Sequence, residues 1–90
     1  MPRFFFTTNG AEHLVDKEGC ELHDPDQARL LAVKLAGAIL NDQPFLLSDA
    51  RELRVEVRDE DGAFISLVSV SMTSDPPQHQ RGGKVLRFVV

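Results

Sequence analysis

Cys20 and His23 are the residues whose types and spacing best fit metal chemistry, because they form a Cys-x-x-His pair. A thiolate and an imidazole at this spacing can both reach one zinc ion. A structural zinc site needs four ligands, however, and the chain contains no second pair of this kind. Residues three apart in an extended segment also point to opposite faces. We therefore predict an ordinary cysteine, with no metal and no other cofactor.

The sequence offers no recognisable set of catalytic groups. A nucleophilic site needs a serine or cysteine beside a histidine that a carboxylate orients, and no Gly-x-Ser-x-Gly turn is present. The run Gly82-Gly83-Lys84 lacks the upstream glycine and the following Ser or Thr of a phosphate-binding loop. The acidic run Asp59-Glu60-Asp61 is typical of a solvated turn. We predict that the protein is not an enzyme.

Basic residues gather in the C-terminal half of a chain whose net charge is −4. Alternation places Arg54 and Arg58 on one strand face, and Arg51 and Arg87 are the other candidates for a small basic surface. Such a surface could bind the phosphates of RNA or DNA. The chain has no Tyr or Trp to stack on bases, and a solvated face of mixed charge is the simpler interpretation. Nucleic-acid binding is therefore the alternative hypothesis.

The order of the predicted elements indicates an α+β fold, in which one helix packs on one face of an antiparallel sheet. The order is ββ(β)αββ plus a C-terminal strand, and Asn9-Gly10 is typical of a two-residue hairpin turn. We expect one domain over residues 1–72, a flexible loop over 73–83 and a strand extension over 84–90. The predicted strands cover residues 3–8, 13–16, 20–22, 53–58, 63–72 and 84–90.

The strand predicted over 63–72 carries apolar residues of both parities. Ile65 and Leu67 share one parity, whereas Val68, Val70 and Met72 share the other. A β-bulge near Ser66–Val68 would bring all of these apolar side chains to one face. A strand that is buried on both faces is the alternative.

The helix has clear start and stop signals. Asp24 suits the N-cap, Pro25 suits the first helical position, and Gln27 completes the spacing of a capping box. We expect the helix to end near Asp42, because the residue before Pro44 avoids the helical region. A connector over 43–51 should follow.

This helix is apolar on two sides. The stripe that should cover the sheet consists of Ala28, Leu31, Ala32, Leu35 and Ile39. The opposite side carries Leu30, Val33, Gly37 and Leu40 where charged residues would be expected.

Three interpretations of the second apolar side remain open: the chain's own residues 84–90 cover it, a second chain covers it, or the apolar groups are simply exposed. A terminal strand can also pair with the sheet edge of another chain. The predicted interface consists of Leu30, Val33, Gly37, Leu40, Val85, Leu86, Phe88 and Val90.

Three motifs of the sequence are specific: the opening residues 1–6, the run from Asp16 to Leu22, and the Val-x-Val-x-Asp-Glu-x-Gly pattern from Val55 to Gly62. In these motifs the chain resembles a family of short, uncharacterised proteins common in alphaproteobacteria. The family has no established activity, so the resemblance implies no catalytic residue. Its helices usually carry Arg and Glu on the outer side, and residues 73–90 extend beyond its usual end. At the level of the fold, the order of elements is also similar to HicB-type antitoxins.

We therefore expect a small non-catalytic protein that acts through protein contacts, as a homodimer or as a subunit of a complex, with an antitoxin-like regulatory role among the possibilities. A single cysteine fits a reducing compartment. No apolar run approaches the length of a membrane span, and the apolar start is too short for a signal peptide. The sequence thus predicts a cytoplasmic protein with no membrane association.

Overall fold

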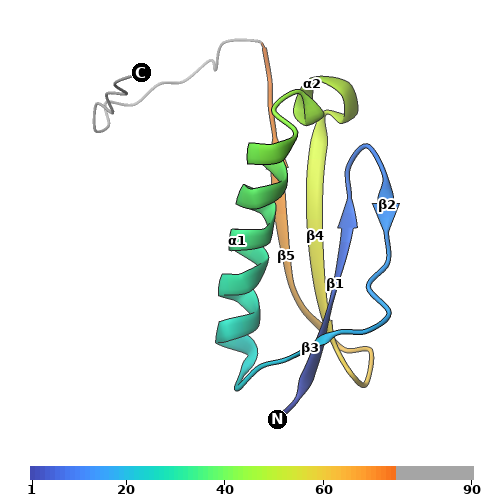
Figure 1. The fold of residues 1–90 in the computed structure, drawn as a ribbon, viewed down its shortest axis with the longest axis vertical. Helices are drawn as coiled ribbons and strands as arrows, with labels where there is room; N and C mark the ends of the chain where they lie inside the picture. Colours follow the sequence, from blue (N-terminus) through green and yellow to red (C-terminus); the bar gives the residue numbers. More distant parts are fainter. Residues whose placement is uncertain (75–90) are drawn as a thin grey trace, which may run out of the picture.

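The computed structural model describes residues 1–74, which form one antiparallel sheet with a long helix packed on one face (Figure 1). The strand order is β2-β1-β4-β5, and β3 also pairs with β1. The predicted α+β class and element order are confirmed. The predicted segments 73–83, apart from its first two residues, and 84–90 lie outside the described part of the chain. The elements are β1 (Arg3–Asn9), β2 (His13–Leu14), β3 (Cys20–Glu21), α1 (Pro25–Asp42), α2 (Leu46–Ala50), β4 (Glu52–Asp59) and β5 (Phe64–Ser71).

The N-terminal hairpin is present but differs from the prediction in its turn. Asn9 pairs with His13, so three residues form the turn rather than the two expected from Asn9-Gly10. The Gly10 N–H donates to the Glu12 carbonyl oxygen at 3.0 Å. The return strand is only two residues long, because the chain leaves the ladder before Asp16 and presents that residue's side chain to β1 instead.

The capping signals place α1 correctly. The Asp24 side chain accepts a hydrogen bond from the Gln27 N–H at 2.9 Å, and Pro25 begins the helix. The Gln27 side chain accepts in turn from the His23 N–H at 2.9 Å. The helix ends at Asp42, two residues before Pro44, as predicted. In the described part of the chain, no helix is long and apolar enough to cross a membrane.

Small residues on α1 allow the helix to approach the sheet closely. Ala28, Ala32 and Ala36 recur every fourth residue and are buried, since they lie on one side of a helix with 3.6 residues per turn. Leucine and isoleucine side chains of α1 extend over the sheet beside this alanine ridge and pack against the core. The sheet contributes the buried side chains of Phe4, Phe6, Leu53, Val55 and Val57.

The irregularity predicted in the last strand exists, but it lies earlier than expected. Ser66 pairs with Val57 and Phe64 pairs with Arg58, so Ile65 is the extra residue of a β-bulge. The bulge brings Ile65 to the helix side, where it packs against the core with Val68 and Val70. Leu67 remains on the helix-free face and is exposed, so the prediction that one bulge brings every apolar residue to one face is wrong.

The connector predicted over 43–51 contains a short helix, α2. Leu46 of α2 is buried in the core. Arg51 follows as its C-cap in the left-handed conformation, with φ 67°. This compact turn redirects the chain from the end of α1 into β4.

Candidate interaction surface

The apolar residues predicted for the outer side of α1 separate into two groups. Leu30 and Val33 each expose 57% of their surface, and a methyl group added at Gly37 would meet no atom within 4 Å. Leu40, by contrast, is half-buried and packs against the core. Its placement on the outer side is therefore corrected, since it projects only about 40° round the helix from buried Ala36. We call Leu30, Val33 and Gly37 the helix stripe.

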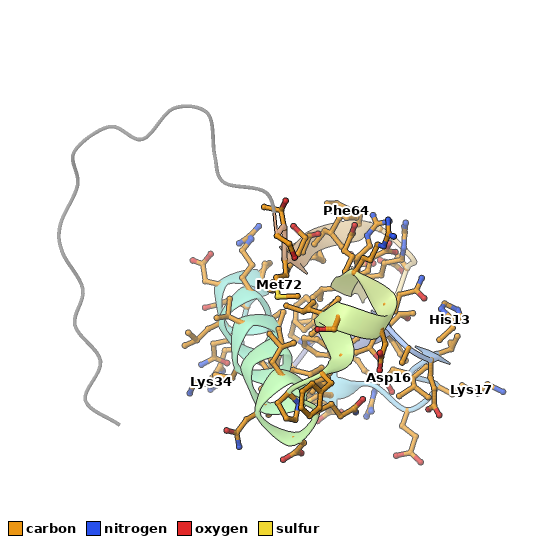
Figure 2. The ribbon with its side chains drawn as sticks, turned by 90° about the horizontal axis from the view of Figure 1, so that it is seen from above. His13, Asp16, Lys17, Lys34, Phe64 and Met72 are labelled. Atoms are coloured by element: carbon orange, nitrogen blue, oxygen red, sulfur yellow. The ribbon has the colours of Figure 1, made fainter. Side chains whose placement is uncertain are left out.

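Beside the helix stripe, β5 forms one edge of the sheet. Within residues 1–74, β5 pairs with β4 alone, so its outer side carries a row of backbone groups without a strand partner. Figure 2 shows Phe64 and Met72 at this side of the molecule, whereas His13 and Lys17 lie on the opposite side. Both apolar side chains are at least half exposed, at 56% and 50%. An edge strand of this kind is a template for pairing with another chain.

The predicted basic face is a face of mixed charge. Arg54 Nε lies 3.3 Å from Glu52 Oε1, and Arg58 pairs in the same way with Glu56, two residues before it. The Arg58 guanidinium also lies 5.9 Å from the centroid of the Phe64 ring. Because each of the two arginines has a glutamate on the same strand face, this part of the sheet carries little net positive charge.

Two further arginines, Arg51 and Arg87, were predicted for the basic surface, and four residues of the C-terminal segment were predicted for the protein interface. Arg51 lies at the end of α2, before β4 begins. The other predicted residues, Val85, Leu86, Arg87, Phe88 and Val90, lie outside the described part of the chain.

At the other edge of the sheet, one carboxylate replaces part of a strand. Asp16 lies in the link between β2 and β3, which pair with the two ends of β1. Its Oδ2 accepts the Phe6 N–H at 3.1 Å, and its Oδ1 accepts the N–H groups of Glu18 and Gly19 at 3.1 and 3.0 Å. The N–H of β1 that no neighbouring strand reaches is thus bound by a side chain. We call residues 16–19 the Asp16 turn.

The environment of the Asp16 turn changes the acidity of its carboxyl group. Burial acts to raise the pKa of Asp16, but the hydrogen bonds from the Gly19, Phe6 and Glu18 N–H groups, together with the charge of Arg3, lower that pKa below its ordinary value. The carboxylate is therefore held in its charged form as a structural acceptor. All of its hydrogen bonds come from backbone groups, so we assign it no catalytic task.

Arg3 and Gly19 complete the Asp16 turn. The Arg3 guanidinium donates to the Glu18 carbonyl oxygen at 2.7 Å and to the Glu21 carboxylate at 3.0 Å. Gly19 has φ 74°, and a Cβ built on it would lie 2.7 Å from Arg3 Cγ and 2.9 Å from a ring carbon of Phe5. Only glycine fits this position without movement of its neighbours.

Cys20, His13 and His23 take part in no grouped site within residues 1–74. Cys20 is half-buried in β3 and packs against the core, while His13 and His23 are exposed. Residues 1–74 contain no group of three or more side chains that could hold a metal ion. A surface hollow of about 340 Å³ beside the N-terminal hairpin contains one carboxylate and no histidine or cysteine; it is lined by Thr8, Gly10, Ala11, Glu12, Leu14, Ile39, Gln43, Leu46 and Leu53.

Residues 3–71 match the model of a protein family, a domain of unknown function, DUF6894. The chain belongs to this family. The matched region begins at the first residue of β1 and ends at the last residue of β5, so the family domain is the sheet and its helices. Neither the curated proteins nor the solved structures include a match to the chain.

Two features of the family domain were missed by inference from sequence. The first is the role of Asp16, which was predicted as the last residue of a return strand. Its position before Gly19 is a usable signal, because an aspartate that precedes a glycine by a few residues often binds backbone N–H groups in a turn. The second is the uncharged edge of β5, which becomes visible only when the strand order is known.

Proposed function

We propose that the protein is a non-catalytic protein-interaction module that acts as a homodimer or as a subunit of a larger complex, in a regulatory role such as that of an antitoxin. The observation that carries this proposal is the helix stripe, in which Leu30 and Val33 are both exposed and Val33 lies on the flank of α1 toward the uncharged edge of β5. Large apolar residues that gather next to an unpaired strand mark interaction surfaces.

The chemistry of the described residues supports contact rather than catalysis. Asp16 is the titratable group with a clearly altered pKa, and its carboxylate is occupied by backbone N–H groups. Active sites usually combine such altered groups with a cleft and a second reacting group. Asp16 does border a hollow together with Lys34, but its carboxylate is already occupied by three backbone N–H groups.

The nucleic-acid hypothesis has weaker support. Phe64 and Arg58 do form a cation–π pair on the helix-free face, and an aromatic ring beside an arginine can stack on a base. The glutamates that pair with Arg54 and Arg58, however, oppose the approach of phosphate groups. Nucleic-acid binding is therefore tested as a competing outcome.

The test compares the wild-type chain with the double variant Leu30→Glu/Val33→Glu. We expect the wild type to be recovered with its own copies or with one protein in fixed stoichiometry, whether or not nuclease is present, and the double variant to lose that association. Lys34→Glu is the control, because it changes the charge by the same two units at an exposed position of the same helix, on the flank that faces β1. Sedimentation velocity and identification of the co-purified chains provide the measurements.

Two outcomes contradict the proposal. Recovery that disappears after nuclease treatment would favour the nucleic-acid hypothesis. If the wild type and the double variant associate with the same strength, the helix stripe is not part of the interface.

A further inference from the structure

We propose that a second copy of this chain pairs with β5, so that the two sheets join edge to edge about a twofold axis and the two α1 helices pack side by side. This inference rests on the proposed function, because it names the partner and the geometry of the same surface. The joined sheet would continue from β4 and β5 of one copy into β5 and β4 of the other.

The composition of β5 makes its edge unusual. Edge strands are normally protected by charged side chains, by proline or by bulges. The residues of β5, Phe64–Ser71, include no charged residue and no proline. The bulge at Ile65 lies near one end and leaves the stretch from Ser66 to Ser71 in regular register with β4. This regular stretch can accept another strand.

The exposed flank of α1 lies on the β5 side of the molecule. Leu31 and Lys34 line a hollow together with Phe6 and Asp16, so this flank of the helix faces β1. Val33 projects about 160° round the helix from Leu31. Val33 therefore lies on the opposite flank, above the β5 edge, where it is exposed.

The spacing of the elements brings two helices to contact distance. α1 contacts both β4 and β5, so its axis runs above the space between them. Neighbouring strands lie about 4.8 Å apart, so a twofold axis just outside β5 is about one strand spacing from the α1 axis. The two α1 axes would then be about 10 Å apart. Packed helices lie about 8–10 Å apart, so the two α1 helices would pack against each other without a gap or a clash.

The two surfaces are also self-complementary in length and charge. α1 has 18 residues and β5 has 8, and both elements are therefore about 27 Å long. They run side by side in the same direction (Figure 1). In the antiparallel arrangement, Val33 near the middle of α1 meets its own copy, and Arg29 lies opposite Gly37 of the second chain. The charge of Arg29 is already paired with Asp26 at 2.7 Å, so no like charges meet.

The experiment places charges on the helix-free face of β5, away from the core. The variants are Leu67→Lys/Ser69→Lys and Leu67→Glu/Ser69→Glu in the full chain, and sedimentation velocity over a concentration series gives their dissociation constants. We expect the wild type to form dimers and each variant alone to self-associate at least tenfold more weakly, because like charges face each other across the axis. An equimolar mixture of the two variants should restore dimers.

The control is Thr7→Lys/Asn9→Lys, which adds the same charge to the helix-free face of β1, away from the β5 edge. We expect this control to dimerise like the wild type. Circular dichroism and thermal unfolding verify that each variant is folded.

Three results would overturn the inference. In the first, the β5 variants dimerise normally while Leu30→Glu/Val33→Glu does not, so the proposed function survives with a different geometry. In the second, the wild type stays monomeric and binds another protein, which again leaves the proposed function standing. In the third, a monomeric wild type begins to associate when Leu86 and Phe88 are replaced by lysine, which would assign the β5 edge to the chain's own C-terminal segment.

Discussion

The two edges of the sheet are treated in opposite ways by the same chain. At the β1 edge, two short strands pair with the ends of β1, and Asp16 binds the Phe6 N–H between them. At the β5 edge, no strand from residues 1–74 pairs with the outer side, and β5 itself carries no charge. One edge is covered by backbone, side chain and ion pair together, whereas the other is left open.

The shortness of the chain therefore does not explain why the β5 edge is open. The chain uses only a few residues to cover the β1 edge, and Arg3 and Gly19 are fitted to that task. At β5, the bulge at Ile65 lies near one end, and Phe64–Ser71 contains no charged residue and no proline to protect the rest of the edge. The proposed second copy would explain why this edge lacks such protection.

The largest expected loss of stability comes from a substitution in the Asp16 turn, which covers the β1 edge. Gly19→Ala should lower the free energy of unfolding by about 3 kcal/mol, because the methyl group meets Arg3 and Phe5 and the backbone has a positive φ. Gly62→Ala is the matched control, since Gly62 has φ 82° but open space around it. Its loss should be about 1 kcal/mol, from the backbone alone. Equal losses in urea denaturation would show that the Asp16 turn can move aside.

A smaller effect is expected when the acceptor of the covered edge loses its charge. Asp16→Asn should lower the free energy of unfolding by about 2 kcal/mol at neutral pH, because one amide oxygen replaces two carboxylate oxygens. Asp61→Asn in the solvated β4–β5 turn is the control and should change stability by less than about 0.5 kcal/mol.

The lowered pKa of Asp16 also predicts how the stability of the protein depends on pH. The folded state lowers the pKa of Asp16 below its ordinary value of 3.8. Its contribution is therefore present above that value and is lost as the pH falls through the folded pKa. The difference in stability between the wild type and Asp16→Asn should narrow in this acidic range. A difference that is independent of pH would mean that the charge of Asp16 contributes nothing to the edge.

The smallest change in stability is expected at Gly37 of the helix stripe, beside the open β5 edge. Gly37→Ala should raise the free energy of unfolding by about 0.5–1 kcal/mol in the dilute chain, because alanine is the better helix former and the added methyl group meets no atom. At concentrations where the chain self-associates, part of this gain should disappear, since the methyl group enters the contact between helices. Thermal unfolding at two concentrations tests this, and an identical gain at both would place Gly37 outside the contact.

Local signals predicted α1 and the longer strands, because each depends on residues close in sequence. Asp24, Pro25 and Pro44 fix the ends of the helix whatever packs against it. The alternation of Leu53, Val55 and Val57 likewise marks one buried face of β4.

The remaining features depend on contacts between distant segments. Hydrophobic spacing placed Leu40 with the outer residues, but its burial depends on where the sheet lies beneath α1. The position of the bulge depends on how β4 and β5 pair, which placed Ile65 rather than Leu67 on the helix side. The three-residue turn and the role of Asp16 also follow from pairing with β1. Residues of the helix stripe could thus be named from the sequence, but the open edge of β5 beside them could not.

The pairing of β1 with β4 has a consequence for the order of folding. This register joins the start of the described chain to its last third, for example Phe6 to Val57, whereas the β4–β5 pair joins consecutive strands. Contacts between distant segments form late because they must close a long loop. β1 must therefore wait for β4 in the folding chain, whereas β2, β3 and Asp16 are close to β1 in sequence. The Asp16 turn can thus form first and would shield one side of the waiting strand from pairing with other unfolded chains.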